Sequence, residues 1–381
     1  MQRPGFDSEH LMFRESYRAF LQQEVQPYKQ AWRKAGIVPR EMFQKMGALG
    51  FLLVWADEAH GGLGLWDFRY QQIMIEEDNR LGEVGFYHTL HSRLVAPYLQ
   101  HFGSAQQQAR YLPACARGDS ILAIAMTEPD AGSDLAGMKT RAVEHADHWL
   151  LNGAKTYISN GINADVLLVA AKTSADNPRQ IGLFLLERGM PGFERGRQLE
   201  KMGLHAQDTC ELFFTDVRVP KDNVLGDVTQ GLNYLKTSLV EERLISAVGS
   251  LANAQGGFEL TRDYVRQRKA FGRPIAEFQN TRFKLAELAA ELEVAQVYVD
   301  HCVTQHNAGE LSAQSAAKAK LVTSELESRV MDTGVQLHGG AGYMQEYEIC
   351  QRFLDARVSR IFAGSSEIMK EIIARAVLGH A

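Results

Sequence analysis

Apolar side chains recur every three to four residues through the first third of the chain, which is the spacing of amphipathic helices. Residues 7–110 are therefore predicted to be mainly helical. Pro27 is expected to interrupt the first helix, because proline lacks the backbone donor and clashes with the preceding turn. A second helix is predicted over residues 40–50, ending at a glycine, and two more over residues 67–111.

The pattern changes near Ile121, where short apolar runs between turn residues replace the helical spacing. These strand-like runs begin at Ile121, His148, Lys155, Val166, Ile181 and Cys210. The pair Asn152-Gly153 predicts a hairpin turn between two of them. Because no long helical pattern separates the runs, we expect a mainly antiparallel barrel or sandwich, and a nicotinamide-type Rossmann fold is disfavoured.

Helical spacing returns after Pro220 and continues to the end of the chain. Four long amphipathic segments fit an up-and-down four-helix bundle: residues 231–268, 281–307, 312–337 and 366–378. The predicted fold class is therefore α+β and multidomain. Its expected units are an N-terminal helical domain at 1–120, a β domain at 121–225 and a C-terminal helical bundle at 226–381.

Composition narrows the range of functions. The 381 residues are 45% hydrophobic and 23% charged, as in ordinary globular proteins, and the net charge of -5 argues against a nucleic-acid partner. The four cysteines are far apart, which indicates buried thiols in a reducing compartment. His88 and His91 lack a third ligand, so no metal site is expected. Without a signal peptide or a membrane-spanning run, the sequence predicts a cytoplasmic protein that does not bind membranes.

The C-terminal part contains a glycine-rich joint between two helical patterns. Gln336-Leu-His-Gly-Gly-Ala-Gly-Tyr ends one pattern, and Gly364-Ser-Ser-Glu begins the next as a helix N-terminus, with serines as caps and an acid in the first turn. Such an end offers free backbone N–H groups to a phosphate or a polarised carbonyl. The same pattern is also typical of an ordinary corner between two helices.

These motifs resemble the C-terminal signature of acyl-CoA dehydrogenases. Thr127-Glu-Pro-Asp-Ala-Gly-Ser-Asp, Lys155-Thr-Tyr-Ile-Ser-Asn and the segment from Arg268 to Gln279 resemble three further motifs of that family, and the likeness in helix–sheet–helix order covers essentially the whole chain. The resemblance implies an FAD cofactor. It implies contacts to FAD from Met126, Thr127, Ser133, Tyr157, Ser159, Ser365 and Glu367, and to the FAD of a neighbouring subunit from Arg268, Phe271, Gln279, Gln336 and Gly340.

One position departs from the usual family pattern. Most members have a glutamate, the base that removes the substrate α-proton, where this chain has Ala363. The isovaleryl-CoA and long-chain acyl-CoA dehydrogenases instead carry their base on the bundle helix before Arg-Leu, and Glu242-Arg243-Leu244 resembles that arrangement. The resemblance implies Glu242 as the catalytic base and Ser133, Arg243, Ala363 and Gly364 as substrate-binding residues.

Helix geometry supports the choice of Glu242 over its neighbour. The face of residues 231–268 that carries Glu242 holds mostly small side chains: Ser238, Ile245, Gly249, Ala252 and Gly256. A substrate could lie close to such a face, and apolar surroundings would raise the pKa of the Glu242 carboxyl toward neutrality. Glu241 points elsewhere and is expected to be a solvated charge.

The implied reaction is α,β-dehydrogenation of an acyl-CoA. Glu242 would take the α-proton, flavin N5 would take the β-hydride beside Ser159, and the backbone N–H of Ala363 would bind the thioester carbonyl. The resemblance also implies a homotetramer, a dimer of dimers, and an electron-transferring flavoprotein as acceptor. An acyl-CoA oxidase and a non-catalytic flavin-binding or acyl-binding homologue are the alternatives. Acyl length and branching stay open, as does the carrier, because Val240 replaces an aspartate that contacts CoA in many members.

Overall fold

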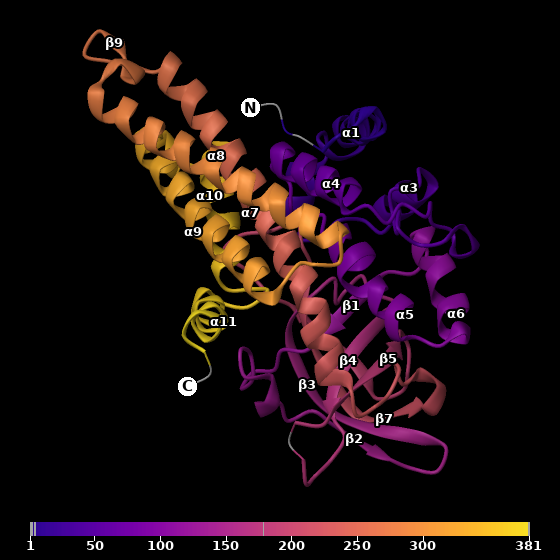
Figure 1. The fold of residues 1–381 in the computed structure, drawn as a ribbon. Helices are drawn as coiled ribbons and strands as arrows, with labels where there is room; N and C mark the ends of the chain where they lie inside the picture. Colours follow the sequence, from indigo (N-terminus) through magenta and orange to yellow (C-terminus); the bar gives the residue numbers. More distant parts are fainter. Residues whose placement is uncertain (1–2, 4, 178, 380–381) are drawn as a thin grey trace.

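The computed structural model describes residues 3, 5–177 and 179–379, and it confirms the predicted order of helices, sheet and helices (Figure 1). In Figure 1 the N-terminal helices and the sheet lie together, and the long C-terminal helices extend away from them as a bundle.

The N-terminal part has more helices than the pattern predicted. Its elements are α1 (Ser8–Phe20), a π-helical turn (Leu21–Val25), α2 (Lys29–Ala35), α3 (Glu41–Ala48), α4 (Phe68–Leu81), a second π-helical turn (Leu90–Val95), α5 (Ala96–Phe102) and α6 (Ala105–Ala116). The prediction of two helices over 67–111 was wrong because a tight corner separates α5 from α6. There the Ser104 hydroxyl accepts a hydrogen bond from the Gln107 N–H at 3.2 Å and starts the new helix.

The middle part is a seven-stranded sheet. Its strands are β1 (Leu122–Ala125), β2 (Arg141–Glu144), β3 (His148–Ser159), β4 (Val166–Lys172), β5 (Ile181–Glu187), β6 (Phe193–Gln198) and β7 (Thr209–Pro220). β2 pairs with β3, β3 with β7, β6 with β7 and β4 with β5, all antiparallel, whereas β1 and β2 each run parallel to β4. The expectation of a mainly antiparallel sheet therefore agrees with most of the pairings.

The hairpin predicted at Asn152-Gly153 is wrong. β3 runs straight through this pair, which lies instead at a bulge where its register against β7 shifts. The Asn152 side-chain amide donates to Asp216 at 3.0 Å and its oxygen accepts from the Asp216 N–H at 2.9 Å. Gly153 has φ +148°, and an added Cβ would lie 2.4 Å from Thr140 Oγ1. Glycine is needed here for close packing and not for a turn.

The C-terminal part consists of α7 (Gly231–Gln267), α8 (Gln279–Asn307), α9 (Ala313–His338), α10 (Glu348–Ala356) and α11 (Ser366–Leu378), with a short hairpin of β8 (Lys269–Ala270) and β9 (Arg273–Pro274) between α7 and α8. α7, α8 and α9 run side by side, and the hairpin lies at the end of the bundle far from the sheet (Figure 1). α7 also packs against α4, so it joins the bundle to the N-terminal helices.

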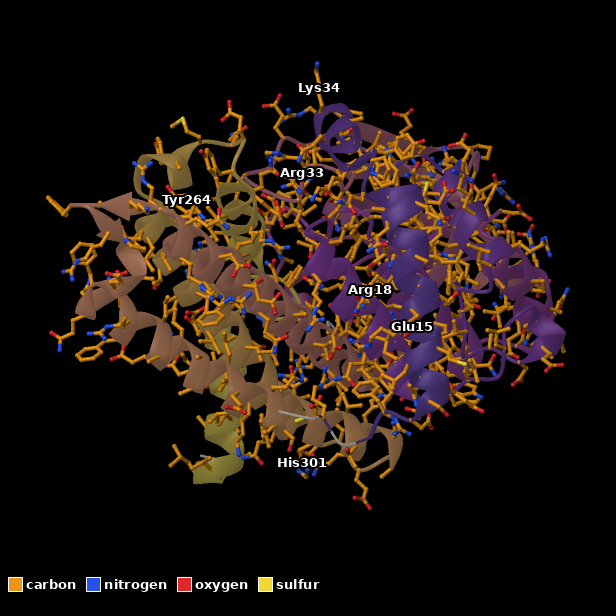
Figure 2. All side chains as sticks on the ribbon, turned by 90° about the horizontal axis from the view of Figure 1, so that it is seen from above. Glu15, Arg18, Arg33, Lys34, Tyr264 and His301 are labelled. Atoms are coloured by element: carbon orange, nitrogen blue, oxygen red, sulfur yellow. The ribbon has the colours of Figure 1, made fainter. Side chains whose placement is uncertain are left out.

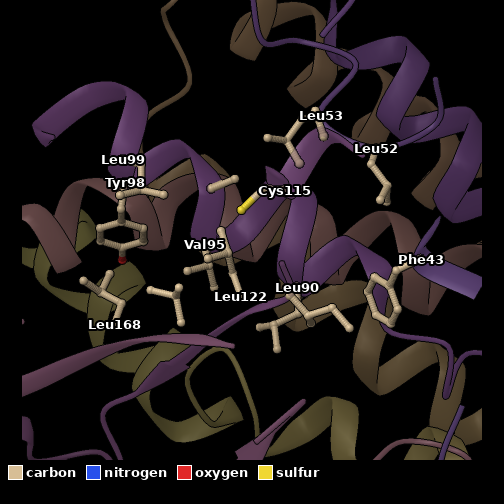
Figure 3. Packing of buried hydrophobic residues seen from close by; sticks show 14 of the residues in the cluster. Phe43, Leu52, Leu53, Leu90, Val95, Tyr98, Leu99, Cys115, Leu122 and Leu168 are labelled. Carbon is tan, nitrogen blue, oxygen red and sulfur yellow. The ribbon is translucent and has the colours of Figure 1, made fainter. Parts of the chain in front are cut away.

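One hydrophobic cluster joins the N-terminal helices to the sheet. Tyr98 and Leu99 of α5 pack with Leu122 of β1 and Leu168 of β4 in this cluster (Figure 3). Each of these side chains is almost fully buried, so the two parts form a single packed body at this contact. This packing fixes α5 and the π-helical turn before it next to α7.

Candidate active site

Glu242 lies on α7 in a setting suited to a general base. The carboxyl is half-buried, and burial raises its pKa to about 7, although the charges of Arg243 and Lys320 act in the opposite direction. Burial also raises the pKa values of Tyr87 and Tyr98, and the charge of Glu242 adds to both shifts. The two tyrosines therefore lie near the carboxylate on the side of the N-terminal helices. A base with a pKa near 7 is poised for proton transfer at neutral pH.

The turn before α11 is linked to the same carboxylate through Lys320 of α9. Ala363 and Gly364 both have left-handed backbone, with φ +53° and φ +93°. The Ala363 N–H has no acceptor within the described residues, and Ser365 begins α11 by accepting from the Ile368 N–H at 3.4 Å. The predicted helix N-terminus is confirmed. Lys320 of α9 donates to the Gly364 carbonyl oxygen at 2.8 Å and also acts on the charge of Glu242, so it connects the two.

The predicted sheet residues of the site lie together at the ends of two strands. Thr127 follows β1, Tyr157 belongs to the end of β3, and the Thr156 N–H donates to the Thr127 carbonyl at 2.9 Å. Tyr157 is 69% exposed and has φ +60°, a conformation that usually marks a functional or strained position. The Asn160 side chain donates to the Tyr87 carbonyl at 3.3 Å, which connects this edge of the sheet to the surroundings of Glu242.

A buried ion pair that the sequence reasoning missed supports the loop after β1. The Lys155 ammonium donates to Glu128 Oε1 and to the Met126 carbonyl oxygen, both at 2.9 Å, and burial lowers the pKa of Lys155. Glu128 also accepts from the Thr140 N–H at 2.9 Å. These bonds fix the backbone beside Met126, whereas Ser133, farther along the loop, is exposed.

The other predicted cofactor residues lie elsewhere in the chain. Arg268, Phe271 and Gln279 belong to the β8–β9 hairpin region at the far end of the bundle, where Phe271 is 96% exposed (Figure 1). The Tyr264 hydroxyl donates to the His338 carbonyl at 3.2 Å, so the end of α9, with Gln336 and Gly340, lies at the same place. Figure 2 shows Tyr264 well apart from Glu15 and Arg18 of the N-terminal helices. Within one chain the structure does not bring this group to the sheet residues.

Glu241 is not a solvated charge, so that expectation was wrong. Its carboxylate accepts from Arg93 Nε at 2.6 Å and pairs with His306 Nε2 at 2.8 Å. Although burial acts to raise the pKa of Glu241, the Arg93 guanidinium and His306 hold it down at about 2. The two adjacent glutamates therefore have opposite electrostatic roles. Glu241 stays ionised and joins α7 to the π-helical turn and α8, whereas Glu242 titrates near neutrality.

The small-residue face beyond Glu242 is only partly open. An added Cβ at Gly249 would lie in ordinary contact, at 3.5 Å, with Ile75 and Asn79 of α4. An added Cβ at Gly256 would lie 2.6 Å from the guanidinium of Arg352, so a protein side chain fills the far end of this face. A bound chain could therefore follow α7 toward Gly249 but not as far as Gly256.

The two histidines considered for metal binding have structural partners. His88 Nε2 contacts Asp78 at 2.8 Å and the Tyr17 hydroxyl at 3.0 Å, and His91 Nδ1 accepts from the Leu122 N–H at 3.0 Å. Among the described residues there is no group of three or more His, Cys, Asp or Glu side chains that could hold a metal ion. All four cysteines are buried free thiols, as predicted. No helix in the described ranges is long and apolar enough to cross a membrane.

Comparison with known proteins agrees with this architecture over nearly the whole chain. Family models for the N-terminal, middle and C-terminal domains of acyl-CoA dehydrogenases match residues 7–119, 123–217 and 229–378. The mitochondrial long-chain specific acyl-CoA dehydrogenase of Rattus norvegicus is 46% identical over 98% of this chain and 87% of its own length. The mitochondrial isovaleryl-CoA dehydrogenase of Pongo abelii is 35% identical over 98% of this chain and 89% of its own length.

Two solved structures are similar along the full fold. An acyl-CoA dehydrogenase from Geobacillus kaustophilus is 46% identical, with a TM-score of 0.96 over 98% of this chain and 99% of that one. An acyl-CoA dehydrogenase complexed with FAD from Bacillus anthracis is 31% identical, with a TM-score of 0.93 over 99% of this chain and 69% of that one. With three family domains in order and these identities, the chain belongs to the acyl-CoA dehydrogenase family of enzymes.

Proposed function

We propose that this chain catalyses FAD-dependent α,β-dehydrogenation of an acyl-CoA thioester to the trans-2-enoyl-CoA, with Glu242 as the base. The observation that carries the proposal is that Lys320 donates to the Gly364 carbonyl oxygen at 2.8 Å and its charge also acts on Glu242, so this lysine links the turn to the carboxylate. The alanine side chain cannot accept a proton, so a carboxylate from another element is needed at this turn. The long-chain specific and isovaleryl-CoA dehydrogenases among the relatives support a thioester substrate.

The pKa of Glu242 suits the removal of a weakly acidic proton. Burial raises this pKa to about 7, so the carboxylate is a stronger base than an exposed glutamate and is still ionised in a large share of molecules at neutral pH. Arg243 and Lys320 lie close enough to keep the pKa from rising farther. We therefore expect the rate of substrate oxidation to increase with pH through about 7 as Glu242 loses its proton.

The backbone before α11 supplies a hydrogen-bond donor for the thioester carbonyl oxygen, which complements the base Glu242. Removal of an α-proton places negative charge on the thioester carbonyl oxygen, and a preorganised donor lowers the barrier to that change. The Ala363 N–H, which has no acceptor among the residues that the structure describes, is such a donor, and the positive end of α11 adds to the local potential. Alanine keeps this N–H, so the replacement of glutamate removes a base but no carbonyl contact. Arg243 and Gly364 complete the proposed substrate contacts.

The residues at the sheet edge fit an FAD. The exposed Tyr157 ring offers a flat surface for a flavin, the Thr127 and Ser133 hydroxyls can donate hydrogen bonds, and nothing lies within 4 Å of a Cβ built at Gly132. The proposed contacts from this chain are Met126, Thr127, Ser133, Tyr157, Ser159, Ser365 and Glu367. FAD, when bound, supplies the acceptor for the β-hydride of the substrate. The similar Bacillus anthracis enzyme has been solved with FAD.

A second subunit would complete the cofactor site. Arg268 and Phe271 are exposed at the end of the bundle, far from the sheet, and no contact among the described residues links them to it. A guanidinium and an exposed ring can bind a pyrophosphate and stack on an adenine. We propose that Arg268, Phe271, Gln279, Gln336 and Gly340 contact the FAD of a neighbouring copy, in a homotetramer built as a dimer of dimers.

An anaerobic titration with a panel of acyl-CoA thioesters tests the proposed function. The purified protein should carry FAD, and a suitable acyl-CoA should bleach the flavin absorbance and yield one trans-2-enoyl-CoA per flavin. Electron-transferring flavoprotein should then reoxidise the enzyme. Flavin that stays oxidised with every thioester would contradict the proposal and favour a non-catalytic binding protein.

The electron acceptor distinguishes an acyl-CoA oxidase from an acyl-CoA dehydrogenase. Stoichiometric hydrogen peroxide in air with excess acyl-CoA would assign oxygen as the acceptor, whereas slow peroxide formation and rapid turnover with electron-transferring flavoprotein would assign a dehydrogenase. The same panel reports chain length and branching. Comparison of a CoA thioester with the matching pantetheine thioester reports how far the enzyme depends on the nucleotide of CoA.

A further inference from the structure

Lys320 is a fully buried lysine with an unusual partner. Its side chain is 0% exposed on α9, and within the described residues its ammonium has one hydrogen-bond acceptor, the Gly364 carbonyl oxygen at 2.8 Å. A buried ammonium with few partners is costly, and burial lowers the pKa of Lys320 to about 8. A methionine or leucine would fill such a position in a helical bundle at less cost. The position of this lysine therefore suggests a role outside packing.

The backbone that Lys320 contacts is strained. Ala363 and Gly364 are consecutive left-handed residues, and the first of them carries a Cβ. A left-handed alanine costs roughly 1–2 kcal/mol, and such conformations persist where the surroundings hold them in place. The Lys320 bond holds the turn directly at its second residue.

A second contact from α9 holds the other side of the turn. Glu325 accepts from the Ser366 hydroxyl at 2.6 Å and pairs with Arg360 at 3.3 Å. The strained pair is thus fixed to α9 both at Gly364 and at the first residue of α11. The orientation of the Ala363 N–H depends on these contacts, because its own donor has no partner in the described structure to hold it.

We propose that Lys320 is a positioning residue, which fixes the Ala363–Gly364 turn for the substrate carbonyl and places a positive charge beside the base Glu242. This inference rests on the proposed function, since it assigns Glu242 and the Ala363 N–H their roles there. The single ammonium acts on both halves of the reaction. It holds the donor that stabilises the developing oxyanion and favours the ionised form of the carboxylate that takes the proton.

Other charges also surround this pair. The groups that act on Lys320 are Glu325, Arg243, Glu327 and Glu367, and those near Glu242 are Arg243, Lys320, Tyr87 and Tyr98. Arg243 is the second cation at Glu242 and would remain after Lys320 is replaced. Loss of Lys320 should therefore raise the pKa of Glu242 without removing all of its cationic surroundings.

The test compares Lys320→Met with Lys318→Met. Lys318 lies on the same helix, is partly exposed and makes no hydrogen bond or ion pair in the described structure, so it controls for the loss of a lysine from α9. Three quantities are measured on the holoenzyme: amide hydrogen exchange over residues 357–366, acyl-CoA affinity, and the limiting rate of anaerobic flavin reduction as a function of pH.

For Lys320→Met we expect faster exchange over residues 357–366 and little change in acyl-CoA affinity. The limiting rate should fall by about 10²-fold, the typical cost of a misplaced reacting group. Its pH inflection, which we expect near 7 for the wild type, should move to higher pH because a cation that acts on Glu242 is gone. A purely structural lysine would leave that inflection unmoved. Lys318→Met should match the wild type in all three measurements.

Lys320→Gln separates the two effects and serves where the methionine variant does not fold. Its side chain is one bond shorter than that of lysine but keeps an N–H donor and carries no charge, so exchange should stay closer to the wild type than in Lys320→Met while the inflection still rises. An inflection that stays at the wild-type pH in this variant, or exchange and rates in Lys320→Met equal to those of Lys318→Met, overturns the inference. The exchange result does not depend on Glu242. Loss of the inflection in Glu242→Gln tests the proposed base separately.

Discussion

Replacing Glu241 with Gln should destabilise the protein strongly, although its neighbour Glu242 is the proposed base. The Glu241 carboxylate is the partner of Arg93, which is 6% exposed, and of His306. Glutamine cannot neutralise the guanidinium, so Arg93 would be left as a buried charge without its counterion. Breaking such a pair by removing one partner typically costs about 3–5 kcal/mol.

The pKa of Glu241 gives a second measure of the same interaction. Its lowering from 4.5 to about 2 corresponds to roughly 3 kcal/mol at neutral pH. Because the side chain is 23% exposed, solvent screening reduces this value, and we expect about 2–3 kcal/mol. A group with a lowered pKa in the folded state stabilises it above the unfolded-state pKa. This contribution is therefore full at pH 7 and is lost as the pH falls through 4.5 toward 2.

The assay is the unfolding midpoint of the FAD-saturated protein in urea, measured at pH 7 and again below pH 4.5. Glu241→Gln should unfold at markedly lower urea than the wild type at pH 7, and the difference should shrink at acid pH as the wild-type carboxylate takes up a proton. Glu259→Gln, an exposed change on the same helix, is the control. Equal midpoints for the two variants at pH 7 would refute the assignment of Glu241 as a buried structural anion.

Three further predictions concern the cofactor and the substrate. Arg268→Ala should weaken FAD retention and lower the share of tetramer, measured by absorbance and light scattering; a fully FAD-loaded monomer would contradict the role of a neighbouring subunit. Lys155→Met should leave Glu128 as an uncompensated buried charge and loosen the loop at Met126, so that FAD dissociates faster in a dilution assay; an unchanged dissociation rate would mean that the pair does not support the flavin. Gly249→Phe would project a ring toward Ile75 and Asn79 and should lower turnover of long-chain acyl-CoAs more than of butyryl-CoA; equal losses would place the substrate chain elsewhere.

Periodicity predicted the order of helices, sheet and helices, but it missed α10, which packs against α7 and α9, and the division of residues 67–111. The helix predicted over residues 366–378 coincides with α11, and the change from helical to strand spacing near Ile121 marks the start of the sheet. Long amphipathic helices bury one face, so the spacing of their apolar residues is enough to predict them. The hairpin prediction at Asn152-Gly153 was wrong because it rested on local backbone preference alone. A hairpin signal describes local backbone preference, whereas β3 pairs with β7 and uses the glycine for contact with Thr140.

The electrostatics of the site could be predicted only in part. The raised pKa of Glu242 agrees with the prediction made from the small, apolar face of its own helix, although the burial that causes it also involves distant segments such as those of Tyr87 and Tyr98. The partners of Glu241 are Arg93 and His306, 148 and 65 positions away, so no local pattern could reveal them. The burial of Lys155 and Lys320 could not be predicted for the same reason. A lysine in a helix or strand is usually exposed, and the packing of distant segments decides otherwise.

The central claim is that Glu242 removes the α-proton, and anaerobic stopped-flow reduction of the bound flavin by an acyl-CoA tests it most directly. Glu242→Gln keeps the shape of the side chain, so substrate should still bind, while the reduction rate should fall by about 10²–10⁴-fold. Adding Ala363→Glu to this variant places a carboxylate at the position more common in the family and should restore part of the rate. A Glu242→Gln enzyme that reduces its flavin at the wild-type rate would contradict the claim.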